Sequence, residues 1–280
     1  MLVRSASNKS LSSENNFLWK SRMTNHSFHI VNPRPWPIRG AIGTLYLTRG
    51  LIGWINKYNN YLIILGVLII VATIIQWWRD IWRESTFTGK HTKKVEEGLR
   101  LGMILFIIRE VFLFLTFFWA FFHSALRPNI EIGSTWPPAV IPLDPFSVPL
   151  LNTTLLLSSG ATITWAHMAM QRSSWIETNI GMMFTVVLGS IFSILQLLEY
   201  GFCSFTMSDS IYGSTFYIAT GFHGLHVLFG TIFIATEWFR HYNGHFTEVH
   251  HFGFEARAWY WHFVDVIWLF LFICIYWWGY

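Results

Sequence analysis

The chain has 280 residues and a formal net charge of +4; 53% of its residues are hydrophobic, 19% are aromatic and only 12% are charged. Soluble domains carry about 25% charged residues, so this chain has too little polar surface for a water-soluble globule, and we expect a polytopic membrane protein. Its cysteines, Cys203 and Cys274, lie in separate apolar segments and indicate neither a disulfide framework nor a thiolate metal site.

The segment 1–22 is rich in Ser and Asn, carries scattered Lys and Arg, and contains no long apolar run. A transit-like peptide is one interpretation, but Glu14 and the lack of an amphipathic stripe weaken it. We therefore favour a disordered N-terminal extension over residues 1–22, followed by a transmembrane domain over residues 23–280.

The apolar runs that follow are long enough to cross a bilayer, which takes about 20 residues. Clear candidates are Asn59–Trp78, Leu101–Phe122, Leu150–Met170, Ile180–Phe202, Ile211–Trp238 and Ala258–Trp278. A weaker candidate, Trp36–Ile55, is interrupted by Arg39 and Arg49. The sequence therefore predicts an all-α membrane protein with seven transmembrane helices.

The distribution of Lys and Arg predicts the topology, because these residues concentrate in inner loops. With seven spans and the N-terminus inside, the outer segments keep only Arg49, Lys57 and Arg127, while Arg109 lies in mid-membrane. The basic balance is then explained without nucleic acid. No internal repeat supports an inverted-repeat transporter.

Glu110 lies near the middle of the span Leu101–Phe122, about 14 Å deep at 1.5 Å per residue. A charged carboxylate at that depth costs at least about 2.5–3.5 kcal/mol. Arg109 is adjacent but about 100° round the helix, so we expect it to be poorly placed to pair with Glu110 directly. A proton-related or lipid-facing carboxylate and an interhelical hydrogen bond both remain open.

Twelve histidines raise the hypothesis of a metal site. His241-x-x-x-His245 and His250-His251 have the pattern of the histidine boxes of membrane desaturases, and Glu248-x-x-His251 has the spacing of a di-iron ligand pair. A di-iron site needs a second such pair and further glutamates, and desaturase boxes spread over several loops. We therefore favour interfacial histidines that bond to head groups or partner chains.

His223-x-x-His226 lies within one predicted span, and its spacing puts both rings on one helical face. They could serve as haem ligands only with partners from other helices. Gly221, Gly224 and Gly230 favour close helix packing instead, with the histidines bonding across the interface.

His262 and Asp265 lie three residues apart in the last span and can bond to each other. Trp261, four residues before Asp265, is within reach for its indole N–H. We expect a structural latch within this helix rather than a catalytic site.

Long motifs in this chain occur in the order found in a known family. They are Met23–His29, Pro35–Pro37, Phe118–Ser124, Pro149–Thr153, Thr164–His167, Tyr212–Phe216, Ala219–His226, His250–Ala256, Trp259–Val266 and Ile275–Gly279. With them, roughly residues 23–280 resemble the cytochrome c oxidase subunit III family.

The resemblance implies seven helices, the first two splayed from the other five around a phospholipid-filled cleft. It implies a non-catalytic core subunit of the haem–copper oxidase that binds no metal of its own, with haem and copper in partner subunits. Subunit I, which reduces oxygen and pumps protons, would be the main partner, beside subunit II and small accessory subunits. The expected location is the mitochondrial inner membrane, with the N-terminus on the matrix side.

The resemblance also implies roles for individual residues. Glu110 matches the family's membrane-buried carboxylate facing the cleft. Matches to its lipid-contacting residues are Trp78, Glu84, His91, Arg240 and His245. Two positions depart from the family pattern: Arg109 replaces a small polar residue, and Met168 replaces a second histidine. The competing hypotheses are a histidine-box membrane oxidase or desaturase and an independent proton-linked carrier.

Overall fold

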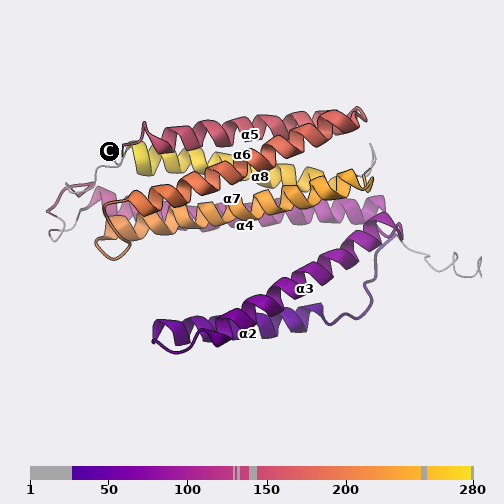
Figure 1. Cartoon of the computed structure of the whole chain (residues 1–280), viewed down its shortest axis with the longest axis horizontal. Helices are drawn as coiled ribbons and strands as arrows, with labels where there is room; N and C mark the ends of the chain where they lie inside the picture. Colours follow the sequence, from indigo (N-terminus) through magenta and orange to yellow (C-terminus); the bar gives the residue numbers. More distant parts are fainter. Residues whose placement is uncertain (1–26, 129, 131–132, 139–143, 247–250, 279–280) are drawn as a thin grey trace, which may run out of the picture. The chain divides into compact units, whose positions relative to one another are not determined.

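The computed structural model describes residues 27–128, 130, 133–138, 144–246 and 251–278, and this part of the chain is all-helical, as predicted (Figure 1). The α-helices are α2 (Trp36–Ile55), α3 (Tyr61–Thr86), α4 (Lys93–Leu126), α5 (Val148–Gln171), α6 (Trp175–Phe202), α7 (Ile211–Tyr242) and α8 (Phe252–Leu271). The last continues as a π-helical turn, η2 (Phe272–Trp277). The predicted extension over residues 1–22 lies outside the described residues.

Of the described helices, α3, α4, α6, α7 and α8 with η2 are long and apolar enough to cross a membrane. The helices α2 and α5 cover the other two predicted spans, but they are not among the helices that are long and apolar enough to cross a membrane. Both α3 and α4 extend beyond their predicted spans, because helical turns bearing charged residues continue past the apolar stretch.

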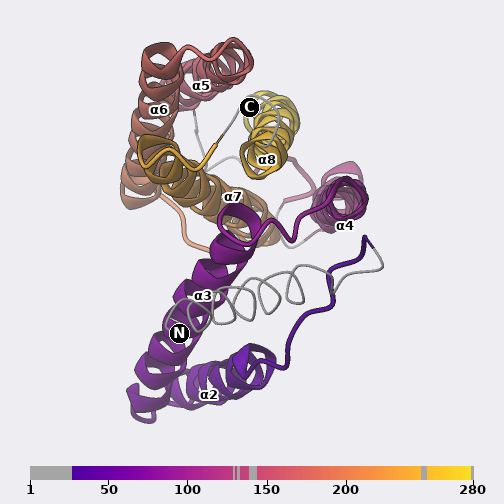
Figure 2. The ribbon, with the colours of Figure 1, turned by 90° about the vertical axis from the view of Figure 1, so that its right-hand side faces the viewer.

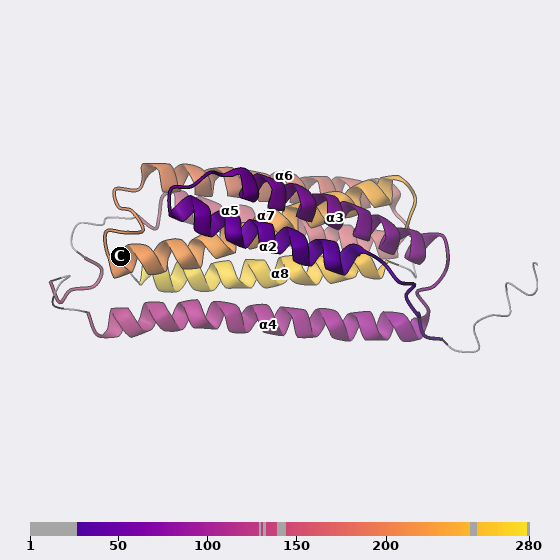
Figure 3. The ribbon, with the colours of Figure 1, turned by 90° about the horizontal axis from the view of Figure 1, so that it is seen from below.

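The chain divides into two compact units, the first ending at Leu99 and the second beginning at Arg100. In the first unit, a short connection after α2 leads into α3, so the two helices run antiparallel (Figure 3). A Cβ at Gly50 would lie 2.5 Å from the backbone nitrogen of Ile63, and one at Gly66 would lie 2.6 Å from that of Leu47. The two backbones are therefore in direct contact, which only glycine permits.

The second unit holds α4 from Arg100 onward together with α5 to α8; α8 contacts both α5 and α7 (Figure 2), and Phe114 and Phe121 of α4 belong to the common core. Large aromatic side chains fill its interior; the fully buried ones are Trp261, Trp268, Tyr212, Tyr276, Phe114, Phe121, Phe192, Phe216 and Phe254. Many meet edge to face, as Phe192 and Trp268 do with ring centroids 4.9 Å apart. Such pairs add stabilisation beyond the area that they bury.

Trp261 occupies a notch between two glycines of neighbouring helices. A Cβ on Gly189 of α6 would lie 2.7 Å from Trp261 Cη2, and a Cβ on Gly230 of α7 would lie 2.9 Å from Trp261 Cε3. The close packing predicted at Gly230 is thus confirmed. The same prediction is wrong for Gly221 and Gly224, where an added Cβ would meet nothing within 4 Å.

The splay of the first two helices from the other five, and the phospholipid-filled cleft that the resemblance implies, stay predictions.

Candidate functional site

Glu110 lies in the middle of α4 and is 8% exposed. The guanidinium of Arg109 donates to Glu110 Oε1 from Nη2 at 2.8 Å and from Nε at 3.2 Å. The prediction that Arg109 is poorly placed to pair directly with its neighbour is therefore wrong. Its long side chain bends back round the helix, and the guanidinium also lies over the Phe106 ring, 4.9 Å from the centroid.

The second oxygen of Glu110 meets His226 of α7, with 3.1 Å between Nε2 and Oε2. The other ring nitrogen, Nδ1, lies 2.6 Å from the carbonyl oxygen of Phe222, which can only accept, so Nδ1 carries a proton. If the imidazole were neutral, its Nε2 would carry no hydrogen and would face a carboxylate oxygen, so that two acceptors would meet. A proton between Nε2 and Oε2 satisfies both atoms, either as imidazolium and carboxylate or as imidazole and carboxylic acid.

Glu110 and His226 therefore form a hydrogen bond that links α4 to α7. Aromatic rings enclose it: Phe114 lies 5.1 Å from the His226 ring, and Tyr260 stacks on it at 6.3 Å. The structural alternative for Glu110, an interhelical hydrogen bond, is present. The other interpretation, a proton-related or lipid-facing carboxylate, stays a prediction.

His223, one turn before His226, is fully buried between Phe192 and Trp268. Its Nε2 lies 3.2 Å from the carbonyl oxygen of Val264 in α8, so it donates across the α7–α8 interface. Both histidines of α7 thus bond to neighbouring helices, which confirms the packing interpretation of this pair.

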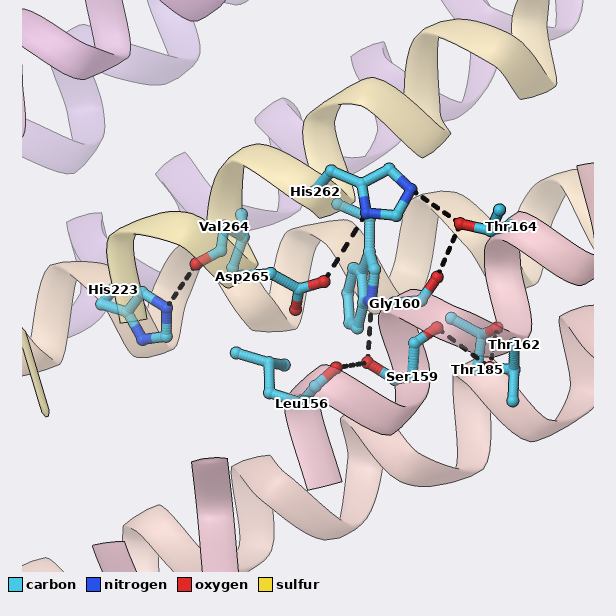
Figure 4. Close-up of polar contacts among 11 residues, drawn as sticks. Leu156, Ser159, Gly160, Thr162, Thr164, Thr185, His223, His262, Val264 and Asp265 are labelled. Atoms are coloured by element: carbon cyan, nitrogen blue, oxygen red, sulfur yellow. Dashed lines mark hydrogen bonds and ion pairs between the residues drawn. The ribbon is translucent and has the colours of Figure 1, made fainter. Parts of the chain in front are cut away.

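A third polar cluster joins α5 to α8 (Figure 4). The indole of Trp261 donates to Ser159 Oγ at 2.9 Å, and Ser159 in turn donates to the carbonyl oxygen of Leu156 at 2.6 Å. The predicted bond from Trp261 to Asp265 is wrong, because the indole points across to α5 rather than along its own helix.

His262 and Asp265 lie within ion-pair distance, 3.8 Å between Nδ1 and Oδ2. The hydrogen bond of His262 goes elsewhere: Nε2 lies 3.2 Å from Thr164 Oγ1 of α5. Since Thr164 donates its own proton to the Gly160 carbonyl at 2.9 Å, its oxygen must accept from His262 (Figure 4). The predicted latch therefore ties α8 to α5 instead of acting only within α8.

A cationic cluster lies at the end of α7. Glu237 is fully buried, accepts from Arg240 Nη1 at 2.9 and 3.1 Å, and forms an ion pair with Arg257 of α8. Arg240 also lies over the Phe246 ring, 4.6 Å from its centroid. Burial, with Arg240 nearby, lowers the pKa of His245 from its usual value. Two guanidiniums against one carboxylate leave an excess positive charge that suits a phosphate.

The first unit carries a related cluster at the end of α3. Glu84 pairs with Arg34, and His29 Nε2 lies 3.8 Å from Glu84 Oε1. The His91 ring lies 6.1 Å from that of His29, so two matched positions, Glu84 and His91, come together around it. Burial lowers the pKa of His29, and the charges of nearby Lys90 and Arg34 add to this effect.

Trp78, the third matched position of the first unit, lies half-buried on α3 two residues before Asp80. Asp80 accepts from the Trp36 indole at 2.9 Å, which ties the beginning of α2 to the end of α3. His29 was missed by sequence reasoning. It lies outside the described helices and meets Glu84 only through the fold of the chain.

Within the described ranges, no three or more His, Cys, Asp or Glu side chains form a group that could hold a metal ion. His241 of the candidate box stacks on Trp175 and Phe246, with ring centroids 6.3 and 6.4 Å apart. Glu248 and His250 lie outside the described residues, so the part of the histidine-box hypothesis that depends on them stays a prediction.

Comparisons with known proteins extend over nearly the whole chain. The model of a family described as cytochrome c oxidase subunit III matches residues 26–280. Proteins named cytochrome c oxidase subunit 3 from Anopheles quadrimaculatus and Pisaster ochraceus are each 58% identical to the chain, over 92% and 91% of its length and 99% and 98% of theirs. The protein of that name from Pelomedusa subrufa is 56% identical over 92% of this chain and 100% of its own length.

Proposed function

Since the chain belongs to the cytochrome c oxidase subunit III family, we propose that it is a non-catalytic core subunit of the haem–copper oxidase, respiratory complex IV. In this proposal it spans the mitochondrial inner membrane with its N-terminus on the matrix side. The excess of Lys and Arg in the segments assigned to that side supports the orientation. Haem and copper would lie in partner subunits, chiefly subunit I.

The role proposed for the chain is to sustain oxygen reduction and proton pumping by subunit I. The observation that carries this role is the hydrogen bond between Glu110 of α4 and His226 of α7, two ionisable side chains that meet at membrane depth. A proton-holding group at membrane depth is costly and is usually functional. Arg109 donates to the other oxygen of the same carboxylate, so both oxygens of Glu110 have a hydrogen-bond partner.

The chain would also bind structural phospholipids at its rims. In the second unit, Arg240 and Arg257 surround a single carboxylate, Glu237. In the first unit, Glu84 and His91 lie beside further basic side chains. Such clusters can hold the phosphate of a lipid head group.

The proposal is tested by extracting the membrane in a gentle detergent and separating its proteins by native electrophoresis. We expect the chain to migrate only in a large assembly that absorbs as haem. A free, iron-binding and oxidising monomer would refute the proposal in favour of a histidine-box oxidase. A free monomer that moves protons in vesicles would refute it in favour of a carrier.

A further inference from the structure

Four carboxyl groups are buried among the described residues, and that of Glu199 on α6 differs from the other three. Each of the others lies within ion-pair distance of an arginine or a histidine side chain; they belong to Glu110, Glu237 and Asp265. Glu199 is 8% exposed, and no Lys, Arg or His in the part of the chain that the structure describes pairs with it. A negative charge on Glu199 would therefore have no counter-charge.

Neutral polar side chains surround the carboxyl group. Gln196 Nε2 donates to Glu199 Oε2 at 3.2 Å and lies 3.3 Å from the hydroxyl oxygen of Tyr276. That hydroxyl group, carried by the π-helical turn η2, also lies beside the carboxyl group. Asn152 of α5 donates to Gln196 Oε1 at 3.3 Å. Asn152, Gln196 and Tyr276 are all buried, so α5, α6 and η2 shield the cluster from water.

The ionisable groups around Glu199 add no positive charge. They are the thiol of Cys203 and the hydroxyl groups of Tyr200, Tyr212, Tyr217 and Tyr276. Each is neutral or, after losing its proton, negative. Tyr200 donates its proton to Thr220 Oγ1 at 2.8 Å, and Tyr217 donates to a backbone carbonyl oxygen at 2.9 Å, so neither proton is directed at the carboxyl group.

These surroundings favour the neutral form of the carboxyl group. An ionised carboxylate would put a negative charge into a dry interior, where Glu199 Oε1 is buried without a hydrogen-bond partner in the described ranges. Taking an ion out of water costs more than one or two hydrogen bonds from neutral donors return. A buried acid without a counter-charge binds a proton instead.

We propose that Glu199 is a proton-binding site of this chain, at which the carboxyl group of the folded protein is a neutral carboxylic acid near neutral pH. The ligand is a single proton. The helix α6 ends at Phe202, about 4.5 Å beyond Glu199 at 1.5 Å per residue. The proton therefore exchanges with the water at this end of the helix. The site is separate from Glu110, which lies in the middle of α4 beside Arg109 and His226.

Infrared difference spectroscopy of the purified assembly that contains the chain tests this proposal near neutral pH. The C=O stretch of a protonated carboxyl group lies above the amide I region and shifts in heavy water, whereas lipid ester bands do not shift. We expect the spectrum of the unsubstituted chain minus that of Glu199→Gln to contain one such band. Glu177→Gln, a control in the first turn of the same helix, should remove none. Equal spectra for the unsubstituted chain and Glu199→Gln would overturn the proposal.

Assembly of the variants gives an independent outcome. Glutamine has the shape of the neutral acid and carries no charge, so Glu199→Gln should assemble as the unsubstituted chain does. If it fails to assemble while Glu177→Gln assembles normally, the position requires a charge and the proposal is overturned.

Proton linkage supplies a second measurement. Glutamate in an unfolded chain is ionised above about pH 4.3, so the folded chain would bind one more proton and lose stability as the pH rises toward neutrality. The equilibrium constant for unfolding should rise by up to about tenfold per pH unit more in the unsubstituted chain than in Glu199→Gln. Denaturant titrations from about pH 5 to 7 measure this difference. Parallel pH dependences of the two chains would overturn the proposal.

This inference and the proposed function fail in distinguishable ways. Absence of the chain from a haem-containing assembly would refute the proposed function, and the proton on Glu199 would still be measurable in the assembly that does contain the chain. Presence in the haem-containing assembly without a band that depends on Glu199 would leave the proposed function intact and overturn this inference.

Discussion

Enlarging the notch glycine Gly230 is a direct test of how Trp261 joins the helices of the second unit. In Gly230→Ala the new Cβ would lie 2.9 Å from both Trp261 Cε3 and Cζ3, whereas carbon atoms pack best at about 3.5–4.0 Å. The indole cannot retreat, because Gly189 lies close on another side and Ser159 holds the ring nitrogen. Overpacking of this kind costs about 1–3 kcal/mol, offset by up to about 1 kcal/mol from the better helix propensity of alanine.

Gly221→Ala is the matched control on the same helix, since nothing lies within 4 Å of its added Cβ. The assay is the midpoint temperature at which this chain leaves the detergent-solubilised complex. Gly230→Ala should lower it by several degrees, at about 2–4 °C per kcal/mol, while Gly221→Ala should leave it unchanged or raise it. The cost of Gly230→Ala should shrink beside Trp261→Phe. Equal midpoints for the two alanine variants would refute the notch.

Other side chains support further expectations. Glu110→Leu leaves its arginine and histidine partners without an acceptor and should destabilise the chain by about 3–5 kcal/mol, against about 1–3 kcal/mol for Glu110→Gln, in the same thermal assay; equal effects would contradict the cluster. Gly50→Ala puts a Cβ 2.5 Å from a backbone nitrogen of α3 and should expose the α2–α3 connection to protease, whereas Gly40→Ala, with nothing within 4 Å, should not. The pKa of His29 in the folded chain lies below its usual value of 6.5, so the unfolded chain binds more protons than the folded chain at a pH between these two pKa values. The stability of the first unit should therefore fall as the pH drops through about 6.5. His29→Gln should remove this pH dependence of stability, measured by proteolysis from pH 8 to 5, roughly the range over which histidine titrates. Arg240→Ala should release phospholipid, measured by mass spectrometry, without loss of the haem spectrum; an unchanged lipid content would count against the rim assignment.

Helical spacing predicted some features of the candidate site and missed others. It placed His223 and His226 on one face and correctly predicted that both bond to other helices. It was wrong about Arg109 and Trp261. Helical spacing gives the direction in which a side chain leaves the backbone, but the partner of a long or broad side chain also depends on how far that side chain extends. Arg109 reaches Glu110 on its own helix, whereas Trp261 reaches Ser159 on a neighbouring helix.

The sequence by itself determined the class of protein, the approximate positions of the seven described α-helices and the family. Those features depend on hydropathy and on ordered motifs, and both are local properties of the chain. Only the tertiary structure decided that Gly230, rather than Gly221 or Gly224, meets Trp261, and that the Trp261 indole donates to Ser159 of α5 rather than to Asp265. Such outcomes depend on how each helix is rotated and how closely it approaches its neighbours, which spacing along one helix does not specify.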